Sequence, residues 1–235
     1  MPSKREITLS TFDGKLLDGL NFCRKVYQFF DQVRAAPDGP SRIRLRPTRT
    51  EKRLLEELIP IAWYVQGRYR AGRRIKVRWF SGSQPFDAVL LSSGVLVEHG
   101  MFPRKLLVEV TLSVHPNEYL VRKLVDEQGR AFGVKGTARD KKSGTIISKP
   151  HVYKNNERVM DLKGQILQCL QKKSAKQYPP GTVLIVDCVA GLLDQTEWDD
   201  AVEEVKKAKL HGAFREVFLC ELVMSRSATL YGENK

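Results

Sequence analysis

Cysteines are scarce in this sequence and are never close together. The 235 residues contain four of them, at positions 23, 169, 188 and 220, with no C-x-x-C pair. That spacing argues against both a zinc site and a disulfide framework. Cys188 and Cys220 lie in apolar runs and are expected to be ordinary core residues. The pattern fits a reducing compartment, and we therefore expect a cytoplasmic protein.

Long apolar runs are absent as well. No stretch approaches the roughly 20 apolar residues that a membrane-spanning helix requires. The start of the chain, from Met1 to Leu9, contains no apolar run of the kind that a secretory signal needs. We therefore expect a protein without a membrane partner.

Acidic residues are the third shortage. Twenty-seven Asp and Glu oppose 40 Lys and Arg, which gives a net charge of +13. The like charges repel one another and destabilise a compact folded state. An excess of this size therefore usually indicates that the protein binds an acidic partner, most often nucleic acid. Ten arginines and two lysines lie between Arg42 and Arg78, opposed by only three glutamates. Because arginine binds phosphate oxygens through two parallel hydrogen bonds, this segment predicts a nucleic-acid interface.

The candidates for contact with nucleic acid combine this segment with two later residues. They are Arg44, Arg46, Arg49, Arg73, Arg74, His115 and Arg122. His115 follows a predicted strand, where its ring could contact a phosphate or act as a base, although a lone loop histidine is more often incidental. Trp63, Tyr64, Tyr69 and Trp79 sit among the arginines. Two interpretations stay open: these aromatics join the interface, or they are core residues beneath a solvated charged face.

The apolar periodicity predicts alternating helices and strands. In chain order, the expected elements are a helix over 14–36, a basic extended arm or edge strand over 41–47, a helix over 49–71, strands over 75–80, 86–91 and 105–114, a helix over 117–128, a loop or mobile hairpin over 130–154, a helix over 157–174, a strand over 182–188, a helix over 197–210 and a strand over 216–223. Thr48 and Glu51 form a capping box for the second helix, and Pro60 is expected to kink it.

This order of elements predicts an α/β fold with a mixed central sheet flanked by helices. Residues 1–47 are expected to form a helical extension and a basic arm. Residues 48–224 would form the α/β domain, and residues 225–235 a frayed tail.

Two acidic residues interrupt the predicted strands. Asp87 stands at the start of one strand, and Glu109 lies inside the next. A carboxylate among apolar neighbours is costly unless it is paired, hydrogen-bonded or bound to a cation. If a hairpin-like connection brings the two together, they suit Mg²⁺, which prefers oxygen ligands and activates water beside a phosphodiester. The simpler interpretations are that Asp87 is a turn or cap residue and that Glu109 pairs with Arg78 or Arg122.

With these acids in place, the sequence resembles the PD-(D/E)XK nuclease superfamily, which has a restriction-endonuclease-like core. The order of helix, three-strand meander, crossover helix and strand matches roughly residues 49–190. Pro85-Phe86-Asp87 resembles the family's first acid, and Glu109-Val110-Thr111 resembles its second motif element. The resemblance implies that Asp87 and Glu109 bind Mg²⁺ or Mn²⁺, with the Val110 carbonyl as a third ligand. Glu56 or Glu57 would match the extra acid that some members carry on the first helix.

One position departs from the family pattern. The lysine that usually follows the second acid by two residues is replaced by Thr111. In the family, that lysine positions the attacking water and neutralises developing charge. Candidates for its replacement are Lys105, on the same strand face as Glu109, and Lys163, Lys172 and Lys173 on the predicted crossover helix. Other members of the family use a different polar residue at this position, which would make Thr111 itself the catalytic candidate. Thr111 is also consistent with a site that binds without cutting.

The sequence therefore favours a Mg²⁺-dependent endonuclease that hydrolyses phosphodiester bonds with a metal-activated water. DNA is preferred over RNA only through the resemblance. One alternative is a catalytically incomplete nucleic-acid-binding module on the same fold, and another is a subunit whose basic surface docks onto an acidic protein. A homodimer or larger complex is compatible with the class, although no pattern in the sequence argues for one.

Overall fold

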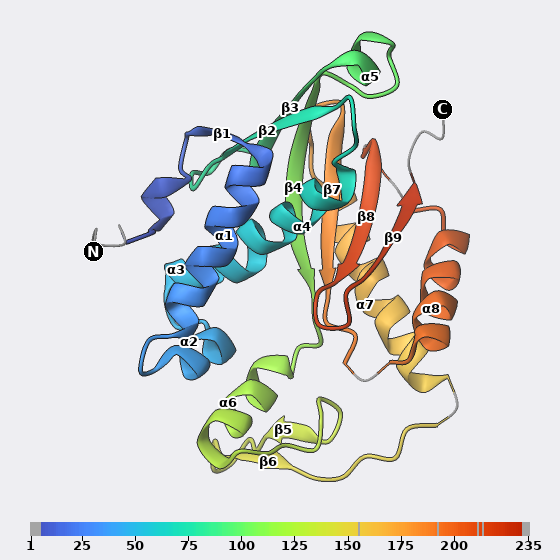
Figure 1. Ribbon diagram of the computed structural model, residues 1–235. Helices are drawn as coiled ribbons and strands as arrows, with labels where there is room; N and C mark the ends of the chain where they lie inside the picture. Colours follow the sequence, from blue (N-terminus) through green and yellow to red (C-terminus); the bar gives the residue numbers. More distant parts are fainter. Residues whose placement is uncertain (1–5, 155, 192, 211, 213, 232–235) are drawn as a thin grey trace.

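A mixed sheet of seven strands forms the centre of this computed structural model, which describes residues 6–231 except 155, 192, 211 and 213 (Figure 1). The strand order is β1-β2-β3-β4-β7-β8-β9. Neighbours from β1 to β4 are antiparallel, β4, β7 and β8 are parallel, and β9 returns antiparallel to β8. The strands span Leu16–Asp18 (β1), Arg74–Trp79 (β2), Ala88–Ser93 (β3), Lys105–Ser113 (β4), Thr182–Cys188 (β7), Glu216–Glu221 (β8) and Arg226–Tyr231 (β9). The expected α/β class and mixed sheet are confirmed.

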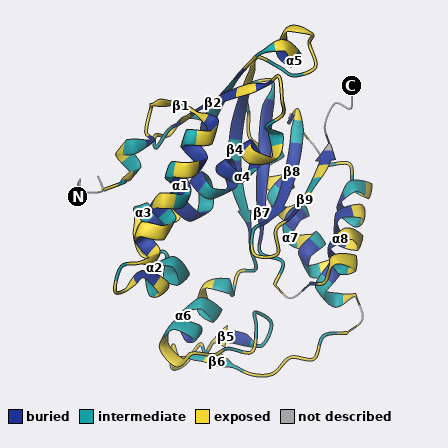
Figure 2. Cartoon of the chain, in the orientation of Figure 1, coloured by how far each residue is buried: buried dark blue, intermediate teal, exposed yellow. Residues whose placement is uncertain are grey.

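Helices cover both faces of the sheet and bury an apolar layer on each (Figure 2). α1 and α4 pack on one face, over alternate strand residues such as Val108, and α7 and α8 pack on the other, over residues such as Leu184. The helices span Gly19–Arg34 (α1), Gly39–Leu45 (α2), Arg49–Arg53 (α3), Ile59–Arg68 (α4), Val95–Glu98 (α5), Glu118–Gln128 (α6), Glu157–Ser174 (α7) and Gln195–Lys207 (α8), with a 3-10 turn at Leu9–Thr11. Among the described residues, no helix is long and apolar enough to span a lipid bilayer.

A small insert separates β4 from α7. It consists of α6 and a two-stranded antiparallel ribbon of β5 (Thr137–Arg139) and β6 (Ile146–Ser148). In Figure 1 the insert, residues 118–148, lies beyond the ends at which β4 and β7 finish. The loop or hairpin expected over 130–154 is thus a short ribbon that packs against α6.

Part of one sheet face carries exposed cations instead of an apolar layer. Along β2, Ile75, Val77 and Trp79 are buried, and the alternate residues Arg74, Lys76 and Arg78 are exposed. The strand register places these cations on the same face as Glu109. On that face α7 packs against β4 and β7. We call Arg74, Lys76 and Arg78 the basic stripe.

The N-terminal segment differs from the expected helical extension. Leu16–Asp18 pairs with β2 as an edge strand, and Asp18 then caps α1 by accepting hydrogen bonds from the Leu20 and Asn21 N–H groups. The prediction of one helix over 14–36 is therefore wrong at its start. Since α1 packs against α4 in the main core, this segment belongs to the same apolar cluster as the sheet.

Two further predictions fail for reasons that lie outside the local sequence. The basic arm expected over 41–47 is the helix α2, with Pro40 in its first turn, where a missing N–H costs nothing. The tail expected over 225–235 contains the strand β9 at Arg226–Tyr231, which hydrogen-bonds to β8 and buries Leu230, and its last four positions lie outside the described residues. In both cases the segment contacts a distant part of the chain: Ser41 and Arg44 of α2 donate to Asp126 of α6, and β9 pairs with β8.

The second helix is distorted just before Pro60. The capping box of Thr48 and Glu51 forms as expected and starts α3. Leu54–Leu58 then winds as a π-helical turn, with the Ile59 N–H donating to the Leu54 carbonyl, before α4 begins. Pro60 has no N–H to continue the regular pattern, so the expected kink is realised as this wider turn.

Candidate active site

The structure brings Asp87 and Glu109 together. Asp87 directly precedes β3, and the antiparallel register with β4 places it opposite Glu109, with both side chains on one face. The Asp87 N–H donates to the Val108 carbonyl at 2.8 Å, and its carboxylate Oδ2 accepts from the Val110 N–H at 2.7 Å. The main chain thus fixes the Asp87 carboxylate beside the middle of β4.

A third carboxylate comes from the π-helical turn. Glu57 forms an ion pair with Arg53, and its Oε2 accepts a hydrogen bond from Trp79 Nε1 at 3.1 Å. Burial, together with the charges of Glu57 and Glu109, raises the pKa of Asp87 to about 7. Burial also raises the pKa of Glu57, and Glu109 adds to that effect. Glu56, the other candidate, pairs instead with Arg46 at 3.0 Å.

A lysine from α7 completes the group. Lys173 Nζ donates to Glu109 Oε1 at 2.5 Å, and the Tyr178 hydroxyl donates to the same oxygen at 3.3 Å. The two charged side chains are only 16% and 13% exposed, so the pair is shielded from solvent. We call Glu57, Asp87, Glu109 and Lys173 the carboxylate cluster. Its members come from four separate elements or loops of the sheet and its flanking helices.

The other lysine candidates lie elsewhere. Lys105 is exposed at the start of β4, four residues and roughly 13 Å from Glu109 along the strand. Lys163 pairs with Glu204 at 2.8 Å, and Lys172 is exposed. Thr111 is half-buried on the same strand face as Glu109. Of these candidates, the structure joins Lys173 to the acidic pair.

The carboxylate cluster has the chemistry of a divalent-cation site, although it is not a complete set of protein ligands. Across the residues the structure describes, no group of three or more His, Cys, Asp or Glu is arranged as a metal site. The Val110 C=O, however, lies on the same strand edge as its N–H, where β3 has ended. Asp87, Glu109 and this carbonyl would supply oxygen ligands, and water would supply the rest, as Mg²⁺ usually requires. Burial is the main cause of the raised pKa of Asp87, and a cation would relieve the repulsion by Glu57 and Glu109 that adds to it.

Most of the predicted nucleic-acid contacts are already paired within the protein. Arg44 binds Asp126 at 2.7 Å, Arg46 binds Glu56 and Arg122 binds Glu118, both at 3.0 Å. Arg49 is exposed and donates to the Ser81 carbonyl. These arginines are held in place, which limits their freedom to reach a phosphate.

Arg73 is a correction to the sequence prediction. Its side chain donates to Ser92 Oγ and lies 4.2 Å above the ring centre of Phe102, and the residue is only 4% exposed. Arg73 therefore supports the fold instead of forming an external surface. His115 lies two residues beyond β4, where its Nδ1 accepts from the Asn117 N–H at 3.1 Å. It is separated from Glu109 by roughly 20 Å of extended chain.

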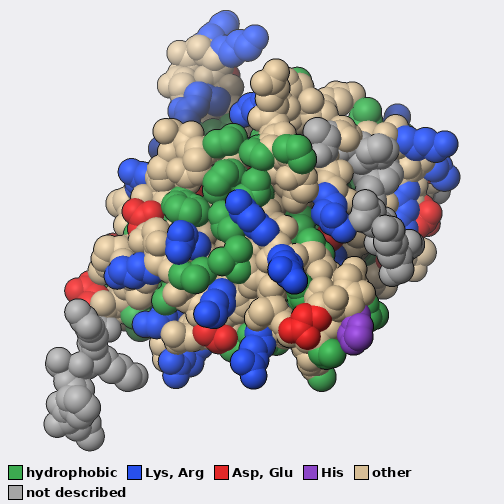
Figure 3. Space-filling model, turned by 90° about the horizontal axis from the view of Figure 1, so that it is seen from above, with side chains coloured by type: hydrophobic (Ala, Val, Ile, Leu, Met, Phe, Trp, Pro, Cys, Tyr) green, Lys and Arg blue, Asp and Glu red, His purple; other side chains and the backbone are tan. Residues whose placement is uncertain are grey.

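The basic stripe includes two cations, Lys76 and Arg78, that are not among the nucleic-acid contacts predicted from the sequence. Lys76 and Arg78 are exposed beside the predicted Arg74, and no carboxylate among the described residues forms an ion pair with them within 4 Å. Charged and apolar residues alternate over 74–79, and this alternation is the sequence pattern that could have predicted one exposed basic face on the strand. Seen from above in Figure 3, Lys and Arg side chains are also scattered over the end of the molecule near α5.

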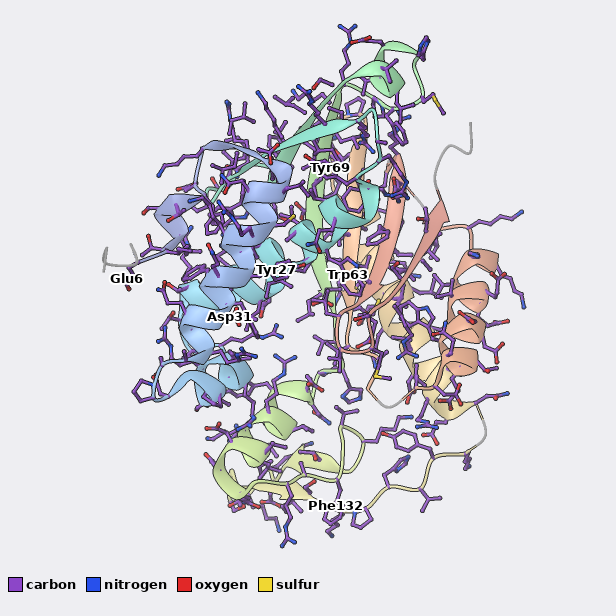
Figure 4. All side chains as sticks on the ribbon, viewed as in Figure 1. Glu6, Tyr27, Asp31, Trp63, Tyr69 and Phe132 are labelled. Atoms are coloured by element: carbon purple, nitrogen blue, oxygen red, sulfur yellow. The ribbon has the colours of Figure 1, made fainter. Side chains whose placement is uncertain are left out.

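The aromatic residues among the arginines are core residues, as one of the two interpretations held. Tyr64 and Trp79 are buried, and Trp63 and Tyr69, labelled in Figure 4, are half-buried and pack against the same apolar cluster. Their rings stabilise the layer between α4 and the sheet. They are not free to stack on bases.

The raised pKa of Asp87 gives a prediction about stability. Between about pH 4 and pH 7 the folded state keeps a proton that the unfolded chain has released, so the free energy of unfolding falls as the pH rises through this range. We expect D87N to be stabilised relative to the wild-type protein at pH 8 but not at pH 4. Urea denaturation without metal ions measures this. An equal effect at both pH values would contradict the burial of an ionisable Asp87.

In comparisons with known proteins, no family model, curated protein or solved structure matches this chain.

Proposed function

We propose that this chain is a divalent-metal-dependent nuclease that hydrolyses DNA phosphodiester bonds on a restriction-endonuclease-like core. The observation that supports the proposal most directly is the carboxylate cluster, in which two cross-strand acids, a helix acid and a lysine converge. The order of helices and strands along the chain also supports the proposal. It follows the arrangement of that class, with helices α3–α4, the meander β2–β3–β4, the crossover helix α7 and then β7. The edge strand β1 and helix α1 are additions at the N-terminal side.

Each residue of the cluster has a distinct role in the proposed reaction. Asp87, Glu109 and the Val110 carbonyl would hold Mg²⁺ or Mn²⁺. The bound metal would polarise a phosphoryl oxygen and lower the pKa of the attacking water. Glu57 holds negative charge beside Asp87 and strengthens the attraction for a cation. Lys173 lies against Glu109, where its ammonium can neutralise charge that develops on the phosphate.

Nucleic acid is the proposed substrate because the cluster lies beside the basic stripe. Arg74, Lys76, Arg78 and Lys105 are exposed and share a sheet face with Glu109. A phosphate backbone that crosses this face would approach the carboxylates from the uncovered side of β2 and β3. The preference for DNA over RNA rests on the family resemblance alone.

A catalytically incomplete binding module remains the second candidate because Thr111 occupies the usual lysine position. The experiment that separates the candidates is incubation of plasmid, linear and single-stranded DNA and of RNA with Mg²⁺, Mn²⁺ or EDTA, with binding measured on every sample. Metal-dependent cleavage of DNA is the expected result. Binding without cleavage would favour the incomplete module. If neither binding nor cleavage is detected, the remaining alternative is that the basic surface binds an acidic protein.

The basic stripe gives a quantitative prediction for binding. We expect K76Q/R78Q to lower DNA affinity and to reduce the slope of log affinity against log salt by about 2, since each lost phosphate contact removes about 0.9. Fluorescence anisotropy over a salt series measures this. K141Q/K142Q, which removes the same charge from exposed lysines between β5 and β6, is the matched control. An equal loss in the control would show that net charge alone drives binding.

A further inference from the structure

A cavity lies away from the carboxylate cluster, between the insert and the main sheet. Its volume is about 410 Å³, within the range of small-molecule sites. One wall is the first half of α7, and another follows the ends of β4 and β7. The insert contributes residues 131–134, which include Phe132, labelled in Figure 4. Crevices beyond the carboxyl ends of parallel strands are common ligand sites.

The walls of this cavity are mainly apolar, and their charges are already compensated. Phe132 is 53% exposed, and Tyr153 provides a second aromatic ring. The acids Glu118 and Asp161 are paired with Arg122 and Lys135 at 3.0 and 2.7 Å. Arg158, the cation of this lining, pairs with Glu197 at 2.8 Å. An anion would therefore meet two carboxylates and only cations that are already engaged, so a neutral planar ligand suits the cavity better than a phosphate.

Two polar groups could orient such a ligand. Gln165 Oε1 is buried, and no donor among the described residues lies within hydrogen-bond distance of it. His115 Nδ1 accepts from the Asn117 N–H, so the neutral ring carries its proton on Nε2 and offers a donor. Gln165 and His115 line the cavity together with Phe132 and Tyr153. Because no donor among the described residues holds Gln165 Oε1, the amide can turn toward a ligand and act as the acceptor, while His115 is the donor. Nucleobases combine a planar aromatic face with ring or exocyclic N–H donors and carbonyl or ring-nitrogen acceptors.

We propose that this cavity binds an unpaired nucleobase, stacked on Phe132 or Tyr153 and donating a hydrogen bond to Gln165 Oε1. The base comes either from a free nucleoside or from an unstacked nucleotide of a strand. The inference goes beyond the proposed cleavage and does not depend on it. The strand β4 runs for four residues, about 13 Å, from Glu109 to Ser113 before the chain reaches this cavity, so a bound base of a cut strand would belong to a nucleotide other than the one being cut.

The test is calorimetric titration, without metal ions, with the four common nucleosides and with short single-stranded DNA that is intact or abasic. Binding of nucleosides would identify a free ligand. Binding of the intact strand in preference to the abasic one, without nucleoside binding, would identify a strand. We expect F132A to weaken base binding at least tenfold and Q165L to weaken it roughly fivefold.

I147A is the matched control, since Ile147 is an exposed apolar residue of the same insert that does not line the cavity. Q165L should not lower the melting temperature, because the amide oxygen has no donor to lose among the described residues. Failure of every base-containing probe to bind, or equal losses in F132A and I147A, would overturn the proposal. A lower melting temperature of Q165L with unchanged affinity would do the same and assign Gln165 a structural role.

Discussion

Metal-dependent cleavage is expected to fall by roughly 10³-fold or more when Asp87 is replaced by Asn or Glu109 by Gln. Each change removes one of two proposed anionic metal ligands, a loss worth several kcal/mol of transition-state stabilisation. DNA binding should be retained, because the basic stripe is untouched. A plasmid-nicking assay with Mg²⁺ and Mn²⁺, beside an anisotropy measurement, gives both quantities.

The control for these variants is E98Q, which removes an exposed carboxylate from α5, at the other end of β3. It should cleave like the wild-type protein. D87N is not expected to unfold, since burial already favours the neutral form of this side chain. Cleavage that survives in both D87N and E109Q would show that the carboxylate cluster is not the catalytic site.

The second large effect concerns the lysine that the motif lacks. We expect K173M to lower the cleavage rate by roughly 10²-fold, because the ammonium beside Glu109 would no longer offset charge on the phosphate. Thr111 shares a strand face with Glu109, so T111K in the K173M background should restore part of the activity. Single-turnover rates for the single and double variants measure this directly.

K172M, which changes the exposed neighbouring residue, is the matched control and should leave the rate unchanged. Loss of Lys173 also leaves a shielded carboxylate without its cation, so the melting temperature must be measured for every variant. Rescue of the cleavage rate by T111K without a matching rise in the melting temperature would separate a catalytic lysine from one that only balances charge in the fold. A fully active K173M would remove Lys173 from the mechanism.

The sequence was sufficient to place Asp87 and Glu109 on adjoining strands. Side chains alternate between the two faces of a strand, and the short connection between the two strands favours antiparallel pairing, so few arrangements of the two acids are possible. It could not choose between Glu56 and Glu57. The choice depends on the π-helical turn, which shifts the direction of every side chain near it and has no distinct local signature. Lys173 could be named as one of several lysines, but its contact with Glu109 spans 64 residues.

Burial was the other property that local patterns could not supply. Arg73 looks like its neighbours in an arginine-rich segment, yet it is enclosed by Ser92 and Phe102 from later parts of the chain. The same limit explains β9, whose conformation depends on the open edge of β8. By contrast, both ends of α7 and of β7 were predicted to the residue. In each of them the apolar pattern is continuous along the element, so the local sequence is enough to define it.

The wide turn at Leu54–Leu58 holds one residue more than an α-helical turn of about the same rotation. Deleting a single residue there would return the segment to ordinary α-helical winding and leave its two flanks in nearly the same mutual orientation. In the regular helices α1 or α7, by contrast, a one-residue deletion would rotate one flank against the other by roughly 100° and move buried side chains out of the core. A one-codon deletion is therefore expected to be tolerated better within this turn, at a position other than Glu57 or the buried leucines, than in either of those helices.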